Sequence, residues 1–168
     1  MNKLCFAGLL LLLLCSAAAA QEELPPPWAR FEPQGVGFSV IMPGKPVETI
    51  TKRTNYTLHS FTVTLGRTIF SATYSDYTTN LDPNKSITAN IEKFNKSLDA
   101  RPLTTREVTL DGHSGVEFTA ETDALNVKSR VFVIGKRMFQ VVALAFKDVD
   151  DSRNVDRFFD SFKFTAAK

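Results

Sequence analysis

Two histidines, each followed at once by a serine, are the residues whose types and spacing come nearest to catalytic machinery. His59 precedes Ser60, and His113 precedes Ser114. A hydrolase of the serine type needs a base beside its nucleophile and a third group that orients the base. Neighbours along a strand point to opposite faces of a sheet, so neither pair can serve as base and nucleophile. A hydrolase that uses His59 or His113 in an unfamiliar way is kept as an alternative.

Other catalytic and metal-binding patterns are missing from the sequence or incomplete. It contains no Gly-x-Ser-x-Gly nucleophile elbow and no glycine loop of the phosphate-binding kind. Asp148, Asp150 and Ser152 are spaced like the first ligands of a calcium loop, but Arg153 stands where that loop needs glycine. Helix capping explains these acids better. We therefore assign no catalytic, cofactor-binding or metal-ligating residue, and we expect a protein that is not an enzyme.

The first twenty residues have the composition of a cleavable export signal. Lys3 supplies an early positive charge, an apolar run extends to Leu14, and small residues end at Ala20. We expect cleavage between Ala20 and Gln21, and a mature protein that is secreted or periplasmic. The apolar run is shorter than the roughly 20 residues that a membrane-spanning helix needs. No later run is longer, so we expect no transmembrane segment in the mature chain.

Both cysteines of the chain, Cys5 and Cys15, lie inside this signal. Acylation at Cys15, which would make the protein a lipoprotein, is the alternative to cleavage after Ala20. Leu14 precedes Cys15 at a position where a lipoprotein signal has a small residue. Without its signal, the chain has no thiol for a disulfide, a nucleophile or a metal site. Packing alone must then stabilise the fold.

The charge of the chain is nearly balanced. It has 20 Lys and Arg residues against 18 Asp and Glu residues, which gives a formal net charge of +2. Binding to nucleic acid through phosphates requires a strongly basic surface. We therefore expect no nucleic-acid partner.

A proline-rich segment separates the signal from the predicted domain. Residues 21–34 contain Pro25, Pro26 and Pro27, and consecutive prolines favour an extended chain that cannot pair as a strand. We expect this segment to be a flexible tether. Residues 35–168 are then a single domain, long enough to bury a core without disulfides.

Alternating apolar and polar residues predict strands through most of this domain. Two-residue turns at Gly66-Arg67, Asp111-Gly112 and Gly135-Lys136 predict hairpins between neighbouring strands. The segment 138–146 is apolar on both faces, so it should be a central strand that is covered on both sides. The expected strands comprise residues 38–42, 48–54, 56–65, 68–77, 108–110, 116–121, 127–133, 138–146 and 163–165.

Two segments instead have the apolar spacing of amphipathic helices. The first helix would be capped by Ser86, and its apolar face consists of Ile87, Ile91, Phe94 and Leu98. The second would be capped by Asp150, Asp151 or Ser152, and its apolar face consists of Val155, Phe158, Phe159 and Phe162. An antiparallel sheet with helices to cover it is an α+β fold, and we expect an α-β-α sandwich.

Four segments, in order along the chain, share the character of one known family. They are residues 37–45 (GFSVIMPGK), 115–118 (GVEF), 138–141 (MFQV) and 161–164 (SFKF). Through them the chain resembles the PsbP-like superfamily, which includes extrinsic subunits of photosystem II, a Ran-binding nuclear import factor and bacterial envelope proteins of the DcrB type. The resemblance implies an α-β-α sandwich and a role in binding or supporting larger assemblies. Photosynthetic members tend to carry a tryptophan where this chain has Pro46, so no photosystem role is carried over.

These observations favour an exported, non-catalytic binding or assembly factor whose partner is an envelope or extracellular protein. A carrier of a small apolar or amphipathic ligand, held between sheet and helix, is the second hypothesis, and it rests on the aromatic content. Phe158 and Phe159 are candidates to line such a pocket, but the packing of a helix on a sheet is the stronger explanation for them.

Overall fold

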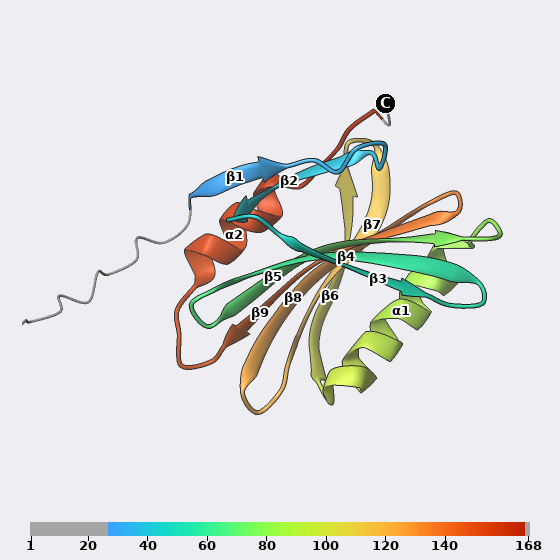
Figure 1. Ribbon diagram of the computed structural model, residues 1–168. Coiled ribbons are helices and arrows are strands. Elements are labelled where there is room, and N and C mark those ends of the chain that lie inside the picture. The colour runs from blue at the N-terminus through green and yellow to red at the C-terminus, as the bar shows by residue number, and fades with distance from the viewer. Residues whose placement is uncertain (1–26, 167–168) are drawn as a thin grey trace, which may run out of the picture.

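A computed structural model describes residues 27–166, in which strands are far more abundant than helices (Figure 1). The strands are β1 (Trp28–Phe31), β2 (Phe38–Pro43), β3 (Val47–Lys52), β4 (Tyr56–Leu65), β5 (Thr68–Tyr77), β6 (Arg101–Leu110), β7 (His113–Glu121), β8 (Leu125–Ile134), β9 (Arg137–Phe146) and β10 (Lys163–Phe164). The helices are α1 (Pro83–Leu98) and α2 (Ser152–Ser161). The predicted signal, its cleavage site between Ala20 and Gln21, and Cys15 lie outside the described residues.

The strands form two antiparallel sheets. Seven strands make a large sheet in the order β3-β4-β5-β9-β8-β7-β6, and three make a small sheet in the order β1-β2-β10. The strand β9 is the fourth of the seven, which confirms the central position predicted from its two apolar faces. The three predicted hairpin turns join β4 to β5, β6 to β7 and β8 to β9.

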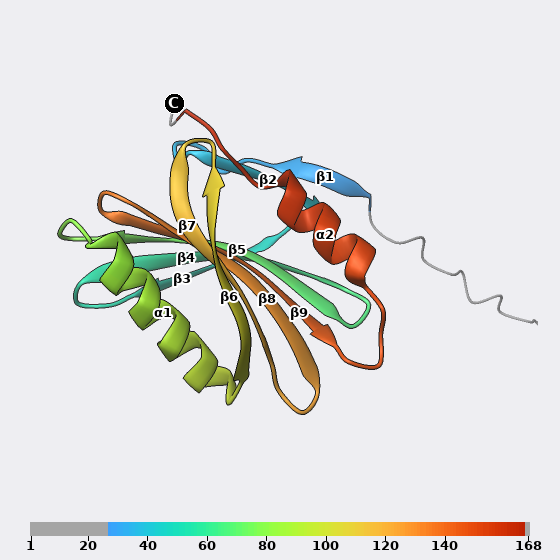
Figure 2. The same ribbon diagram turned by 180° about the vertical axis from the view of Figure 1, so that it is seen from behind.

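The predicted α+β class is wrong, because the protein is β-rich. Strands account for 55% of the described residues and helices for 19%. Neither helix forms a layer over a whole face of the large sheet. The helix α1 packs mainly against β7 and β8, whereas α2 packs against β2 of the small sheet (Figure 2). The second layer over one face is therefore in large part another sheet, and the structure is not an α-β-α sandwich.

The strand β1 lies inside the segment predicted to be a flexible tether. It pairs with β2 along its whole length, from Trp28 opposite Pro43 to Phe31 opposite Val40. The Trp28 ring also packs edge-on against Phe70 of the large sheet, with the ring centroids 5.5 Å apart. This contact ties the strand to the domain.

One face of the large sheet carries most of the core. Phenylalanine rings from the large sheet, from β2, from α2 and from the residue after α2 pack together there. All of them are almost completely buried: Phe38, Phe70, Phe132, Phe158, Phe159 and Phe162. Gly115 of β7 lies opposite Phe132, and an added Cβ would come within 2.4 Å of that ring. The packing on this face thus leaves no room even for a methyl group.

The beginning of α1 differs from the prediction. Asp82, not Ser86, is the N-cap, and its carboxylate accepts a hydrogen bond from the backbone N–H of Lys85 at 3.0 Å. Pro83 fits the first turn because its missing N–H would be unpaired there in any case. Ser86 is consequently part of the helix. Within residues 27–166, neither helix is both long and apolar enough to cross a membrane.

Candidate ligand-binding site

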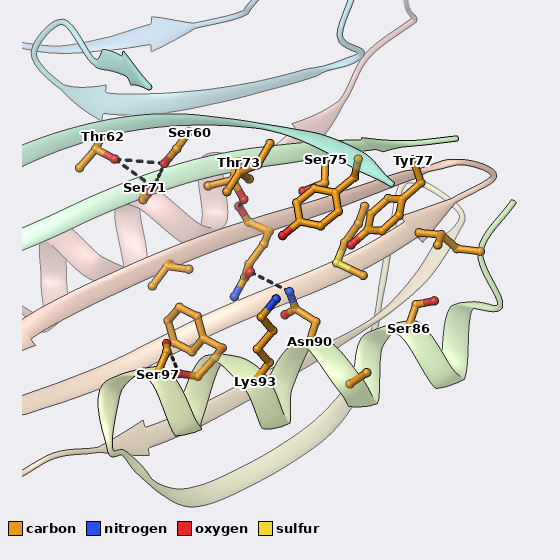
Figure 3. A pocket seen from close by; sticks show the side chains of 18 of the residues that line it. Ser60, Thr62, Ser71, Thr73, Ser75, Tyr77, Ser86, Asn90, Lys93 and Ser97 are labelled. Atoms are coloured by element: carbon orange, nitrogen blue, oxygen red, sulfur yellow. Dashed lines mark hydrogen bonds between the residues drawn. The ribbon is translucent and has the colours of Figure 1, made fainter. Parts of the chain in front are cut away.

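The second face of the large sheet is covered only in part. The helix α1 packs there through Ile87, Ile91 and Leu98, mainly over β7 and β8. The neighbouring strands β9, β5 and β4 lie beside the helix instead of beneath it. Between these three strands and α1 lies a cavity of 660 Å³, shown in Figure 3. Ligand pockets commonly have volumes of about 300–1,000 Å³.

A polar band crosses the middle of the cavity floor. Ser60 of β4 lies beside Thr73 of β5, which in turn lies beside Gln140 of β9. In the next row, Thr62 lies beside Ser71. The hydroxyl oxygens of Ser60, Thr62 and Ser71 are 3.2–3.5 Å from one another (Figure 3). These three hydroxyls, here called the hydroxyl triangle, can turn their O–H groups to donate to a ligand or to accept from it.

Apolar side chains flank the polar band at both ends. At one end the rings of Tyr56 and Tyr77 stack with centroids 5.0 Å apart, and Met138 lies on the adjoining strand. The other end is lined by Ile69, Leu144 and Phe94. Burial, and then the nearby Tyr56, raise the pKa of Tyr77 above its ordinary value of 10.0, so its phenol is neutral at physiological pH. The cavity is therefore apolar, then polar, then apolar along its length.

Two residues of α1, Asn90 and Lys93, face this floor in Figure 3. The Asn90 amide donates to Oε1 of Gln140 at 3.4 Å, and the Gln140 amide donates to the Ser129 hydroxyl at 3.0 Å. This chain of bonds sets the direction of both amides. It leaves Oδ1 of Asn90 buried without a donor among the described residues. A buried acceptor in that state lowers stability.

Lys93 is the one charged residue among those that line the cavity, and all of these belong to the described chain. None of the ion pairs within residues 27–166 includes it. Arg53, Tyr56, Tyr77 and Lys93 also surround a shallower hollow that adjoins the cavity. The cavity and its surroundings thus present positive charge, and no carboxylate lines it.

Both histidines lie away from the roles that a hydrolase would give them. His59 stacks on Tyr74 with ring centroids 4.4 Å apart, and its Nδ1 lies 2.9 Å from Oε1 of Glu48. That places His59 on the filled face, while Ser60 points into the cavity on the other face. His113 packs edge-on against Phe164. The geometry therefore brings neither histidine to its neighbouring serine.

The other candidate residues have structural contacts. Phe158 and Phe159 are completely buried in the core and do not line the cavity, so core packing, the favoured explanation, accounts for them. Asp148 pairs with Arg67 at 3.2 Å, and Asp150 accepts a hydrogen bond from the backbone of Ser152. Among residues 27–166, no three His, Cys, Asp or Glu side chains gather as a metal-binding group would.

Sequence reasoning proposed a ligand between sheet and helix without assigning to that site any of the residues that line this cavity. Ser71, Thr73 and Ser75 alternate with buried Phe70 and Ala72, a pattern that is equally typical of a strand with one face in water. The central strand β9 contained a usable signal. Its residues on the cavity face are apolar except for the amide of Gln140: Met138, Gln140, Val142 and Leu144.

Comparisons with known proteins identify no family. No family model matches the chain, and no curated protein matches it. A crystal structure from Bacteroides thetaiotaomicron aligns with a TM-score of 0.43 and 12% sequence identity, over 80% of this chain and 47% of the other. The chain therefore spans about half the length of that protein. The resemblance to the PsbP-like superfamily stays a prediction.

Proposed function

We propose that the protein is a non-catalytic binding protein for a small amphipathic molecule, held between α1 and the large sheet. The observation that carries the proposal is the 660 Å³ cavity at that seam. The opposite face of the same sheet is packed without space for an added methyl group at Gly115. The helix α1 leaves apolar side chains of the lining, such as Leu58, Ile69 and Leu144, partly exposed, and apolar surface gathered in an open pocket favours an occupant.

The lining indicates what kind of molecule would fit. Apolar ends would hold apolar parts of a ligand, while the hydroxyl triangle and the amides of Asn90 and Gln140 would bind its polar group. A few polar groups at fixed positions in a largely apolar pocket are the usual basis of small-molecule recognition.

The lining also favours binding over catalysis. It contains Ser and Thr hydroxyls, but no His, Asp or Glu that could take their protons, and its one lysine, Lys93, is exposed instead of desolvated as a lysine base would be. An activated hydroxyl nucleophile needs such a base within hydrogen-bond reach. The export signal predicted at residues 1–20 would place this binding protein in the periplasm or outside the cell.

A role as an assembly factor for an envelope or extracellular protein is the second candidate, and one observation favours it. The strand β3 lies at an edge of the large sheet, and the side chains of Val47 and Ile50 on it are 70% and 52% exposed. Unpaired sheet edges can accept a strand from another protein. The two roles are compatible, because β3 does not line the cavity.

The neutral fluorescent probe N-phenyl-1-naphthylamine tests the first proposal. We expect its fluorescence to rise saturably with the purified protein. The substitution Ser71→Trp places an indole on the cavity floor, and it should weaken probe binding by about tenfold or more because the ring occupies the volume that the probe needs.

Ser114→Trp is the matched control, since Ser114 is an exposed strand residue that does not line the cavity. It should leave probe binding within about twofold of wild type, and circular dichroism should show that both variants are folded. No saturable binding, or equal binding by both variants, would refute the proposal.

A further inference from the structure

We propose that the ligand is an anionic amphiphile, with one carboxylate head group and an apolar body, and that Lys93 binds the carboxylate. The inference rests on the proposed binding function and adds the charge of the molecule that is bound. Its starting point is the charge of the cavity, where Lys93 stands without an acidic neighbour among the residues that line it.

Each partly buried cation within residues 27–166 has a carboxylate partner, whereas Lys93 is exposed and would need one only once a ligand covers it. Arg130, whose side chain is 15% exposed, pairs with Glu117 at 2.6 Å, and Arg137 pairs with Asp76 at 2.5 Å. Lys93 belongs to no ion pair within the described residues. Because Lys93 is exposed, its ammonium can be hydrated when the cavity has no ligand. An anionic ligand would supply the partner that the protein lacks here.

The groups around Lys93 suit a carboxylate. Figure 3 shows its ammonium reaching from α1 towards the floor, beside Asn90. An ammonium has three N–H donors, so it can donate to both oxygens of one carboxylate. The hydroxyl triangle adds O–H donors farther along the same polar band. The polar band is thus rich in donors, as an anion requires.

The apolar ends of the cavity would accommodate the apolar body of the ligand. A head group over the polar band would leave an alkyl chain or an aromatic body to cover one of the apolar ends, lined by Tyr56 and Met138 or by Ile69 and Leu144. A cationic head group would meet Lys93 and Arg53 without any carboxylate to offset them. The repulsion between these like charges disfavours binding.

Three twelve-carbon molecules that differ only in the head group test the inference. Dodecanoate, dodecanol and dodecylamine are each used to displace N-phenyl-1-naphthylamine from the purified protein at neutral pH. We expect dodecanoate to compete best and dodecylamine worst. Lys93→Gln should raise the dissociation constant for dodecanoate about three- to tenfold, the range of a charged hydrogen bond at a partly exposed site, and change that for dodecanol less than twofold.

Lys96→Gln is the matched control, because Lys96 is exposed on the same helix and does not line the cavity. It should leave all three dissociation constants unchanged. Dodecylamine competing as well as dodecanoate, or equal effects of the two lysine substitutions, would overturn the inference. If Ser71→Trp still weakens probe binding in that case, the proposed binding function stands and only the anionic charge of the ligand is refuted. Absence of any probe binding would overturn both.

Discussion

The two faces of the seven-stranded sheet differ in how completely they are covered. One face lies under the small sheet and α2, and the rings of Phe70 and Phe132 on it are completely buried. The other lies under α1 alone, and the cavity is open over β4, β5 and β9. A helix is about 10–12 Å across and strands lie about 4.8 Å apart. One helix can therefore cover only two or three of the seven strands.

This difference separates stability from binding. The filled face has no space to accommodate a ligand, and changes to its packing act directly on the free energy of unfolding. The open face carries hydroxyl and amide groups whose neighbours are partly empty space. We expect substitutions there to alter ligand affinity while the fold persists.

The largest difference in unfolding free energy between the two faces is expected when one phenylalanine on each is replaced by alanine. Phe158 is completely buried and packs edge-on against Phe70 at 5.2 Å, so Phe158→Ala should lower the free energy of unfolding by about 3–5 kcal/mol. Phe94 packs against Phe118 at 5.9 Å but also borders the cavity. Phe94→Ala should therefore lower it by only about 1–2 kcal/mol, since it enlarges an existing space.

Urea unfolding followed by circular dichroism measures both values. Equal losses for the two variants would mean that the cavity face is packed as tightly as the core.

Glu117 is the one charged side chain among the buried residues of the described chain, and it lies on the filled face. It is 5% exposed and accepts hydrogen bonds from Arg106 at 2.8 Å and Arg130 at 2.6 Å. Arg130 also donates to the backbone carbonyl of Phe159, which links the carboxylate to α2. Glu117→Gln leaves Arg130 with no charged partner, and we expect a loss of about 2–4 kcal/mol in unfolding free energy.

The pH dependence of that loss has a defined sign. Burial by itself would raise the pKa of Glu117, but the hydrogen bonds from Arg106 and Arg130 outweigh it and hold the pKa below its ordinary value of 4.5. The contribution of the charge is therefore complete above pH 4.5 and is lost as the pH falls through the lower value in the folded protein. The difference between wild type and Glu117→Gln should narrow below pH 4.5.

Glu107→Gln serves as the control for this measurement, since Glu107 is exposed and belongs to no ion pair within residues 27–166. Its unfolding free energy should stay within about 0.5 kcal/mol of wild type. A difference for Glu117→Gln that persists unchanged at low pH would show that the charge of Glu117 does not stabilise the fold.

Local patterns in the sequence predicted the strands better than their arrangement. The alternation in β4 and β5, with Gly66-Arg67 between them, determined both strands and their hairpin. The strand β6 was predicted only at residues 108–110, because the rest of it is exposed and has no burial pattern to detect. The strand β1 follows three prolines and forms because β2 offers it an edge, a contact between segments that no local pattern contains.

Local patterns could not predict the layers of the fold or the cavity either, because both depend on contacts between segments that are distant in the sequence. The alternation of Ser71 and Ala72 shows that two faces exist, but not which one water reaches. That depends on where α1 lies across the sheet, which is settled by its contacts with β7 and β8. The fold class was wrong because the apolar residues of β2 could equally have joined the large sheet, whereas they form a second sheet above it.

The smallest effects are expected from adding the same side chain to neighbouring residues of β5. Ala72 is completely buried on the filled face, so Ala72→Val should lower the unfolding free energy by about 1–3 kcal/mol through overpacking. Ser71→Val adds its methyl groups to the cavity beside Val142. The hydrogen bonds that it removes are offset by apolar contact and by the preference of valine for strands, so stability should change by no more than about 0.5 kcal/mol.

Urea unfolding of the two variants, in the same buffer and without added ligand, makes the test. Because the substitutions lie one residue apart on one strand, any general intolerance of β5 to valine would lower both stabilities alike. A loss confined to Ala72→Val would show that the two faces differ in free volume. A loss of equal size for Ser71→Val would mean that the cavity closes in solution, and the binding proposal would lose its main support.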